Sequence, residues 1–345
     1  MASTLKNNES RSKALKYAFV VATVFVVLAA SFFYSSKKEN ESAVYTKTLM
    51  GTVVQITLMD GDVQRFDEAA EAAFGEISRL EEIFSSYKDS SDVARINAAA
   101  GKALVDVRPE TIEVMREALR VAALSDGAFN PAVGVFARVW GPSGEKGEVP
   151  PAAEIKKLLP YVDFKGILLR EHEKKAGLKR EGMAINLGGV AKGYIVSKAA
   201  SILEKTGVTK AIIHAGGDMT VFQRNGDAPF IVGIQHPREK KLIGEVRLYN
   251  GAVATSGDYE RFFIKDDVRY HHILDPETGF PSKGVQGVTL IDKDPTEADA
   301  LSTAVFVLGP EKGMALIEKL KDVEGVIIDE NGRVTVSSGF QGKIY

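Results

Sequence analysis

Three oxygen-bearing side chains lie within five residues of one another near the C-terminal end of the chain. Asp299 and Thr303 are four residues apart in a segment that predicts a helix, and Ser302 precedes Thr303. Because residues four apart share one face of a helix, their oxygens can converge on one cation. Mg²⁺ suits such a set because it takes few protein oxygens and retains phosphate or water ligands. An aspartate near a helix start is also a common cap, so both interpretations stay open here.

A glycine-rich segment, Asn186–Tyr194, predicts a strand that passes through glycines into a helix. Glycines let backbone groups approach a ligand, and a helix N-terminus that carries Lys192 favours a phosphate. The same pattern also serves as a plain connection between a strand and a helix.

Two of the five histidines, His271 and His272, are adjacent in the chain and precede the turn at 275–279. On an extended segment neighbouring side chains point to opposite faces, so one ring can line a site while the other is structural. The functional interpretation is a general base or a phosphate partner. The alternative is a pair of ordinary hydrogen-bonded histidines.

The composition excludes several chemistries. The chain has no cysteine, which rules out disulfides, thiolate metal sites and a cysteine nucleophile. Nucleotide and hydrolase signatures such as G-x-G-x-x-G, the Walker loop, H-E-x-x-H and G-x-S-x-G do not occur in the sequence. Its 44 basic and 46 acidic residues show no basic stripe, so a nucleic-acid partner is not expected.

The N-terminus predicts export. Residues 17–34 form an uncharged apolar stretch that is long enough to cross a bilayer, and basic residues precede it. We therefore expect a cytoplasmic basic tail at 1–16, a transmembrane anchor at 17–34, a linker at 35–44 and an exported domain at 45–345. A cleaved signal peptide is the alternative, because Ala29 and Ala30 provide small residues. The first 38 residues carry a formal charge of +5, which leaves an acidic body of −7.

The body alternates irregularly between strand and helix patterns, which favours an α+β fold over a doubly wound sheet. The expected strands are 52–58, 211–214, 230–234, 244–249, 261–264 and 287–291. The expected helices are 66–84, 109–124, 191–205, 298–308 and 310–320. Asn225-Gly226 and Asn331-Gly332 predict hairpin turns, 142–151 predicts a loop and 254–261 predicts a polar loop before a strand.

Taken in chain order, eight segments of the body resemble the ApbE family, the FAD:protein FMN transferases. They are 50–52, 84–87 with 92–97, 127–131 with 140–141, 186–194, 216–218, 255–261, 272–279 and 297–303. The resemblance covers residues 45 to 320. It implies an α+β fold around a largely antiparallel sheet with flanking helices.

The resemblance also implies a reaction that depends on Mg²⁺ and uses FAD as its substrate. A threonine or serine hydroxyl of an acceptor protein would attack the FMN-side phosphate of FAD, which forms a phosphoester-linked flavin and releases AMP. The acceptor would carry the pattern D-x-x-[ST]-G-A-[ST]. With export, this suggests a membrane redox-complex subunit, of the sodium-pumping or Rnf type, on the periplasmic side of a bacterial inner membrane. The chain's own 299–305 lacks the glycine of that pattern, so self-modification there is not expected.

Site residues follow from the resemblance, position by position. His272 matches the family's active-site histidine, as a base or a phosphate-positioning group. The metal ligands would be the Gly189 carbonyl and the oxygens of Asp299, Ser302 and Thr303. The FAD contacts would be Met50, Tyr87, Ala128, Phe129, Asn130, Asn186, Lys192 and Leu274.

Two of these positions depart from the family, because Asn130 and Asn186 stand where aspartates are common. An amide keeps an acceptor oxygen but loses the charge, so a role as a base is not expected at either position.

Two other functions would use the same residues. A Mg²⁺-dependent FAD pyrophosphatase would use water in place of the acceptor hydroxyl, and an exported FAD carrier would bind without turnover. The Asp299, Ser302 and Thr303 set favours catalysis over carriage but does not separate transfer from hydrolysis.

Overall fold

The computed structural model describes residues 42–60, 62–141, 147–224 and 228–345. The predicted basic tail and membrane segment lie outside these residues, as do Asn225-Gly226 and part of the 142–151 loop. Within the described ranges, none of the helices combines the length and apolar character needed to cross a membrane.

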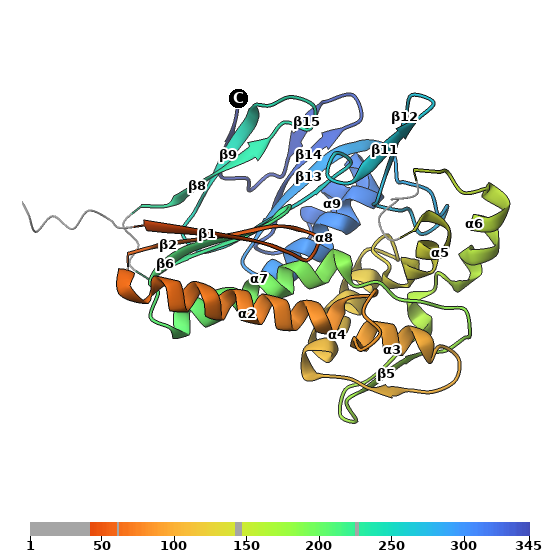
Figure 1. The fold of residues 1–345 in the computed structure, drawn as a ribbon. Helices are drawn as coiled ribbons and strands as arrows, with labels where there is room; N and C mark the ends of the chain where they lie inside the picture. Colours follow the sequence, from red (N-terminus) through yellow and green to blue (C-terminus); the bar gives the residue numbers. More distant parts are fainter. Residues whose placement is uncertain (1–41, 61, 142–146, 225–227) are drawn as a thin grey trace, which may run out of the picture. The chain divides into compact units, whose positions relative to one another are not determined.

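The centre of the fold is an eight-stranded sheet in which every neighbouring pair is antiparallel. Its order is β1-β2-β6-β7-β10-β13-β14-β15 (Figure 1). The strands are β1 (Ser42–Leu49), β2 (Thr52–Met59), β6 (Lys210–Ala215), β7 (Asp218–Gln223), β10 (Gly251–Gly257), β13 (Val285–Asp292), β14 (Glu324–Asp329) and β15 (Val334–Val336). The prediction of an α+β fold on a largely antiparallel sheet is therefore confirmed.

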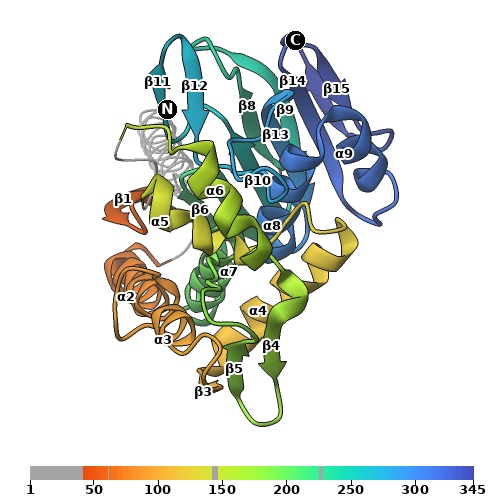
Figure 2. The ribbon, with the colours of Figure 1, turned by 90° about the vertical axis from the view of Figure 1, so that its right-hand side faces the viewer.

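Helices cover one face of this sheet (Figures 1 and 2). They are α2 (Phe66–Phe84), α7 (Gly188–Lys205), α8 (Pro295–Leu308) and α9 (Pro310–Ile317), and α4 (Pro109–Leu124) packs on α7 and α8. Apolar residues at three- and four-residue spacing on α2 pack against the alternating Val54, Ile56 and Leu58 of β2. This match between a helix period and a strand period forms the main core.

A three-stranded sheet packs on part of the other face of the central sheet. It consists of β8 (Phe230–Gln235), β9 (Leu242–Leu248) and β16 (Gly342–Ile344). Strand β10 shows how the layers are specified: Ala252 and Ala254 pack with Ala298 of α8, while Val253 packs with the core of the small sheet. Small residues on the α8 side let that helix lie close to the sheet.

The remaining elements are shorter, and some of them border the cavity described below. A hairpin is formed by β11 (Phe262–Lys265) and β12 (Val268–His271), and a small sheet by β3 (Val105–Asp106), β5 (Lys175–Leu178) and β4 (Ile167–Arg170). Short α-helices are α3 (Asp92–Ala98), α5 (Ala137–Trp140) and α6 (Ala152–Leu158). Short 3-10 helices are Val63–Arg65, Pro131–Phe136, Leu159–Tyr161 and Phe164–Gly166.

Several predicted boundaries need correction. Helices α7 and α8 each begin three residues earlier than predicted, and α8 does so because Asp294 caps it by accepting from Thr296 N–H. Helix α9 ends at Ile317, and the first half of the predicted polar loop 254–261 belongs to β10. Strand β1 begins at Ser42, inside the predicted linker.

The two predicted hairpins have different outcomes. Asn331-Gly332 connects the paired strands β14 and β15, as expected. Asn225-Gly226 lies outside the described residues, and the strands that flank it join different sheets, β7 the central sheet and β8 the small sheet. A local turn signal cannot specify which sheet the next strand joins.

Helices α7 and α8 cross at Gly193, and this crossing predicts the effect of a single methyl group. A Cβ at Gly193 would lie 2.0 Å from the Pro295 carbonyl oxygen and 2.8 Å from the Asp299 Cβ. We expect Gly193→Ala to lower the free energy of unfolding by about 1–3 kcal/mol, measured by urea denaturation.

The matched control is Gly75→Ala on α2, where an added Cβ meets no atom within 4 Å. It should raise stability by about 0.5–1 kcal/mol, because alanine restricts the unfolded chain and favours helix. Equal effects of the two substitutions would contradict the close crossing.

Candidate active site

A cavity of about 790 Å³ lies where the central sheet, α7, α8 and the β11–β12 hairpin meet. Of the thirteen predicted site residues, twelve line it. They are Met50, Tyr87, Ala128, Phe129, Asn130, Asn186, Gly189, Lys192, His272, Leu274, Asp299 and Thr303. The structure therefore brings the predicted residues together, while their individual roles stay predictions.

Ser302 is the exception, because it is buried behind the cavity wall. Its hydroxyl donates to the Asp299 carbonyl over 2.9 Å and lies 2.8 Å from the Ser256 Oγ. The Ser256 Oγ is in turn 3.4 Å from the Thr303 Oγ1. Ser256 thus forms a cluster of hydroxyl side chains with Ser302 and Thr303, and the sequence places it in a matched segment without an assigned role.

The two asparagines that replace aspartates use their side-chain oxygens locally. Asn186 Oδ1 accepts from Gly188 N–H over 2.7 Å, and Asn130 Oδ1 accepts from Ala132 N–H over 3.0 Å. Each oxygen orders the entry to a helical segment that borders the cavity, in the manner of an Asx turn. An amide can do this as well as a carboxylate, so the departure from the family pattern leaves the local backbone intact.

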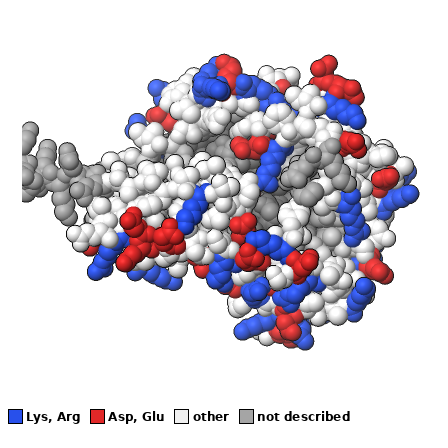
Figure 3. Space-filling view, in the orientation of Figure 1, with Lys and Arg blue, Asp and Glu red and all other residues white. Residues whose placement is uncertain are grey.

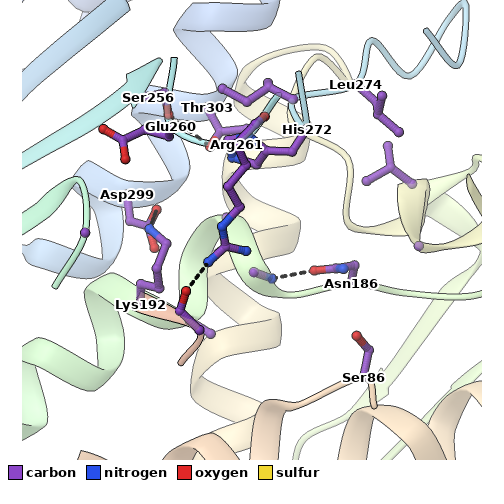
Figure 4. A pocket seen from close by; sticks show the side chains of 18 of the residues that line it. Ser86, Asn186, Lys192, Ser256, Glu260, Arg261, His272, Leu274, Asp299 and Thr303 are labelled. Carbon is purple, nitrogen blue, oxygen red and sulfur yellow. Dashed lines mark hydrogen bonds and ion pairs between the residues drawn. The ribbon is translucent and has the colours of Figure 1, made fainter. Parts of the chain in front are cut away.

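The start of α7 brings Lys192 between two buried carboxylates from other elements. Its Nζ forms a close ion pair with Asp218 Oδ2 at the start of β7, and lies 3.4 Å from Asp299 Oδ1 in α8. Asp299 Oδ2 accepts from Gly193 N–H over 2.9 Å. Figure 4 shows Lys192 and Asp299 facing each other across the floor of the cavity.

Burial and these contacts shift the protonation equilibria. Burial disfavours the charged lysine, but the negative charges of Asp218 and Asp299 outweigh it and raise the pKa of Lys192 above its ordinary value. Burial, and then the charge of Asp299, raise the pKa of Asp218, while Lys192 opposes this. The group is therefore an electrostatically strained cluster in which the ammonium compensates two acids.

The adjacent histidines both border the cavity, but their rings have different surroundings. The His271 ring is buried, with Nε2 2.9 Å from the Ser282 carbonyl and its edge against Phe306. The His272 ring opens to the cavity, and its Nδ1 lies 3.3 Å from the Arg261 carbonyl (Figure 4). Packing by surrounding protein, and then the positive charge of Arg261, lower the pKa of His272 to about 4. His272 is therefore neutral at pH 7 and can accept a proton.

An aromatic wall, which the sequence reasoning missed, lines another part of the cavity. Trp140, Phe263 and Tyr270 all border it. Phe263 and Tyr270 stack with ring centroids 5.2 Å apart, and each lies against Trp140. The Trp140 Nε1 donates to the Gly279 carbonyl over 2.9 Å. Such a wall can hold a flat ring by stacking.

Arg261 is a further residue that the sequence placed in a matched segment without assigning a role. Its guanidinium reaches from the loop before β11 to the turn between β1 and β2, 3.3 Å from the Gly51 carbonyl. Met50 and Gly51 in that turn both have positive φ. The side chain therefore places a cation at the cavity, next to the turn between β1 and β2 (Figure 4).

The oxygen chemistry of the site fits a hard cation. The described residues hold no group of three His, Cys, Asp or Glu side chains suited to a metal. The available donors are instead Asp299, the neighbouring hydroxyls and the backbone carbonyls that border the cavity. These are ligands that Mg²⁺ accepts together with phosphate or water.

The fold and site define an α+β protein with a cavity that combines an acidic and basic floor with an aromatic wall. The model of the ApbE family matches residues 50–327, and the chain belongs to this family. Among curated proteins, it is 35% identical over 295 residues to the FAD:protein FMN transferase of Treponema pallidum, which covers 80% of this chain and 81% of that protein. It is 31% identical over 303 residues to the protein of the same name from Klebsiella pneumoniae, with 87% and 93% covered.

Solved structures agree with this assignment. The ApbE protein of Thermotoga maritima superposes with a TM-score of 0.80 at 35% identity, which covers 86% of this chain and 97% of that one. The flavinyl transferase ApbE of Pseudomonas stutzeri gives a TM-score of 0.76 at 27% identity, with 87% and 95% covered.

The lowered pKa of His272 can be measured by NMR titration of its ring, assigned with His272→Gln. We expect a midpoint near 4, far below the usual 6.5, so that the ring stays neutral down to about pH 5. Arg261→Gln should raise that midpoint, because it removes a positive charge that disfavours the protonated ring.

Arg238→Gln is the matched control, because Arg238 pairs with Asp258 and does not contribute to the shift of His272. A His272 midpoint that is the same in all three proteins would show that Arg261 does not act on the ring.

Proposed function

We propose that this chain is an FAD:protein FMN transferase. The observation that carries the proposal is the convergence of Lys192, Asp299, Thr303 and His272 on one cavity with an aromatic wall. The curated relatives that match most of the chain bear the same activity in their names. The acceptor's threonine or serine oxygen would bond to the FMN-side phosphorus of FAD as the bond to the AMP oxygen breaks. The products are a phosphoester-linked flavin and AMP.

Mg²⁺ would be held by Asp299, Thr303 and the Gly189 carbonyl, with Ser302 supporting them from behind. The close approach of these groups favours this assignment, because a Cβ at Gly189 would lie 3.2 Å from the Thr303 Oγ1. When bound, the metal supplies positive charge to the phosphate oxygens. The acidic body makes such a charge necessary, since it would otherwise repel a pyrophosphate.

The chain's own side chains have distinct proposed roles. Lys192 and Arg261 would offer cationic hydrogen-bond donors to the pyrophosphate. Neutral His272 would accept the proton of the acceptor hydroxyl or orient the phosphate, and the two roles are compatible with the same ring position. The aromatic wall would stack on a ring of FAD, with Met50, Tyr87, Ala128, Phe129, Asn130, Asn186 and Leu274 as further contacts.

The domain layout and location are also part of the proposal. We infer that residues 17–34 anchor the chain in the inner membrane, with 1–16 in the cytoplasm and 45–345 on the periplasmic side. The uncharged stretch and its preceding basic residues support this orientation. The acceptor would then be a membrane redox-complex subunit with the D-x-x-[ST]-G-A-[ST] pattern.

A transfer assay tests the reaction. The protein is mixed with FAD, Mg²⁺ and an acceptor that carries D-x-x-T-G-A-T, and acceptor mass and AMP are measured. We expect AMP and an acceptor heavier by one FMN minus water, in equal amounts. Free FMN with an unmodified acceptor would instead establish hydrolysis, and FAD binding without either product would establish a carrier.

Asp299→Asn is the variant that tests the metal site in this assay. It should reduce kcat/KM for transfer by about 100-fold or more, because it removes the charge closest to the proposed cation. Asp292→Asn is the matched control, since Asp292 is another buried aspartate but does not line the cavity. It should retain activity, and loss in both variants would point to a general effect of buried charge.

The membrane anchor predicts where the expressed protein is found. The full chain should sediment with bacterial membranes, and the mass of the purified chain should include residues 1–41. Added protease should digest the body in spheroplasts but not in intact cells. A soluble chain that begins near residue 31 would contradict an anchor and support a cleaved signal peptide.

A further inference from the structure

The strongest unexplained feature of the site is that Lys192 has two buried acidic partners. Lys192 lies in the first turns of α7, Asp218 begins β7, and Asp299 lies in the second turn of α8. Both carboxylates are 3% exposed, while the lysine side chain is 29% exposed. One ammonium thus compensates two acids, which leaves a formal charge of −1 when both are ionised.

The two carboxylates have unequal contacts. Asp299 already accepts from Gly193 N–H, and its Oδ1 is 3.4 Å from the ammonium. Asp218 forms the closer ion pair with Lys192, and its Oδ1 has no hydrogen-bond partner among the described residues. A buried carboxylate oxygen without a partner is costly, so its place next to Lys192 calls for a reason.

The reason concerns competition for Asp299. The proposed Mg²⁺ and the Lys192 ammonium are both cations beside the same carboxylate, so they repel each other at close range. Lys192 can release Asp299 at low cost only if another buried carboxylate receives it. Asp218 provides that carboxylate, and its free Oδ1 gives the ammonium a second acceptor.

We propose that Asp218 is a positioning residue that draws Lys192 away from Asp299 and so keeps Asp299 available to the metal. In this arrangement Lys192 is a tethered cation that partly neutralises Asp299 in the metal-free protein. Binding of Mg²⁺ changes the formal charge of the group from −1 to +1, which suits an anionic phosphate. The inference rests on the metal site of the proposed function.

The test is Mg²⁺ binding to the full chain in detergent, measured by calorimetry without FAD or acceptor. Asp218→Asn should weaken Mg²⁺ binding by about tenfold or more, because Lys192 then has Asp299 as its remaining carboxylate partner. Adding Lys192→Met to that variant should restore the dissociation constant to within about threefold of the unaltered protein. A purely structural role of Asp218 would not give this rescue.

Lys192→Met alone is a second, independent arm. It should tighten Mg²⁺ binding, because it removes a competing cation without touching either carboxylate. This arm keeps the inference open to refutation if Asp218→Asn fails to fold, which thermal unfolding would reveal.

The matched control is Glu113→Gln, which removes an acid that pairs with Lys198, a lysine farther along α7. It should leave Mg²⁺ binding unchanged, and an equal weakening would overturn the inference by showing a general charge effect. An unchanged dissociation constant in Asp218→Asn, or no rescue by Lys192→Met, would overturn the inference alone. Failure of the unaltered protein to bind Mg²⁺ would overturn both the inference and the metal site of the proposed function.

Discussion

The hydrogen bond from Gly193 N–H to the Asp299 carboxylate is the contact on which the site depends. It joins α7 to α8, and it can form because position 193 has no side chain at the crossing. The same approach brings Thr303 beside Gly189 and Lys192 beside Asp299. A small-residue crossing of two helices therefore sets the distances between groups that are more than 100 residues apart in the chain.

That crossing has an electrostatic consequence. It buries acidic and basic side chains at the floor of a cavity, while acidic and basic residues are interspersed on the outer face shown in Figure 3. Inside, Asp218 and Asp299 are nearly inaccessible, and their interaction with Lys192 is stronger than the same pairs would have in water. The charged groups at the cavity are therefore local and buried, and the net charge of −2 gives no indication of them.

Much of this arrangement could be predicted from the sequence, because its signals are local. The spacing of apolar residues predicts α2, and the alternation of apolar residues predicts β2. Of the thirteen candidate residues chosen from the ordered motifs, twelve line the cavity. Ser256 and Asp218 lie within matched segments, but the sequence does not single them out, because their importance comes from contacts with Ser302 and Lys192. Such contacts depend on strand order, which a local pattern does not contain. Strand order also decides that β8 joins the small sheet and does not pair with β7.

The aromatic wall shows the same dependence on long-range packing, and it bears on His272. Phe263 and Tyr270 lie on paired strands of the β11–β12 hairpin and stack against Trp140. Arg261 and His272 flank that hairpin, so the stacking that anchors it also fixes where they meet the cavity. Burial lowers the pKa of His272, and the positive charge of Arg261 lowers it further. Ring packing beside the cavity therefore helps to hold Arg261 and His272 in place, and the paired strands next to them position the histidine.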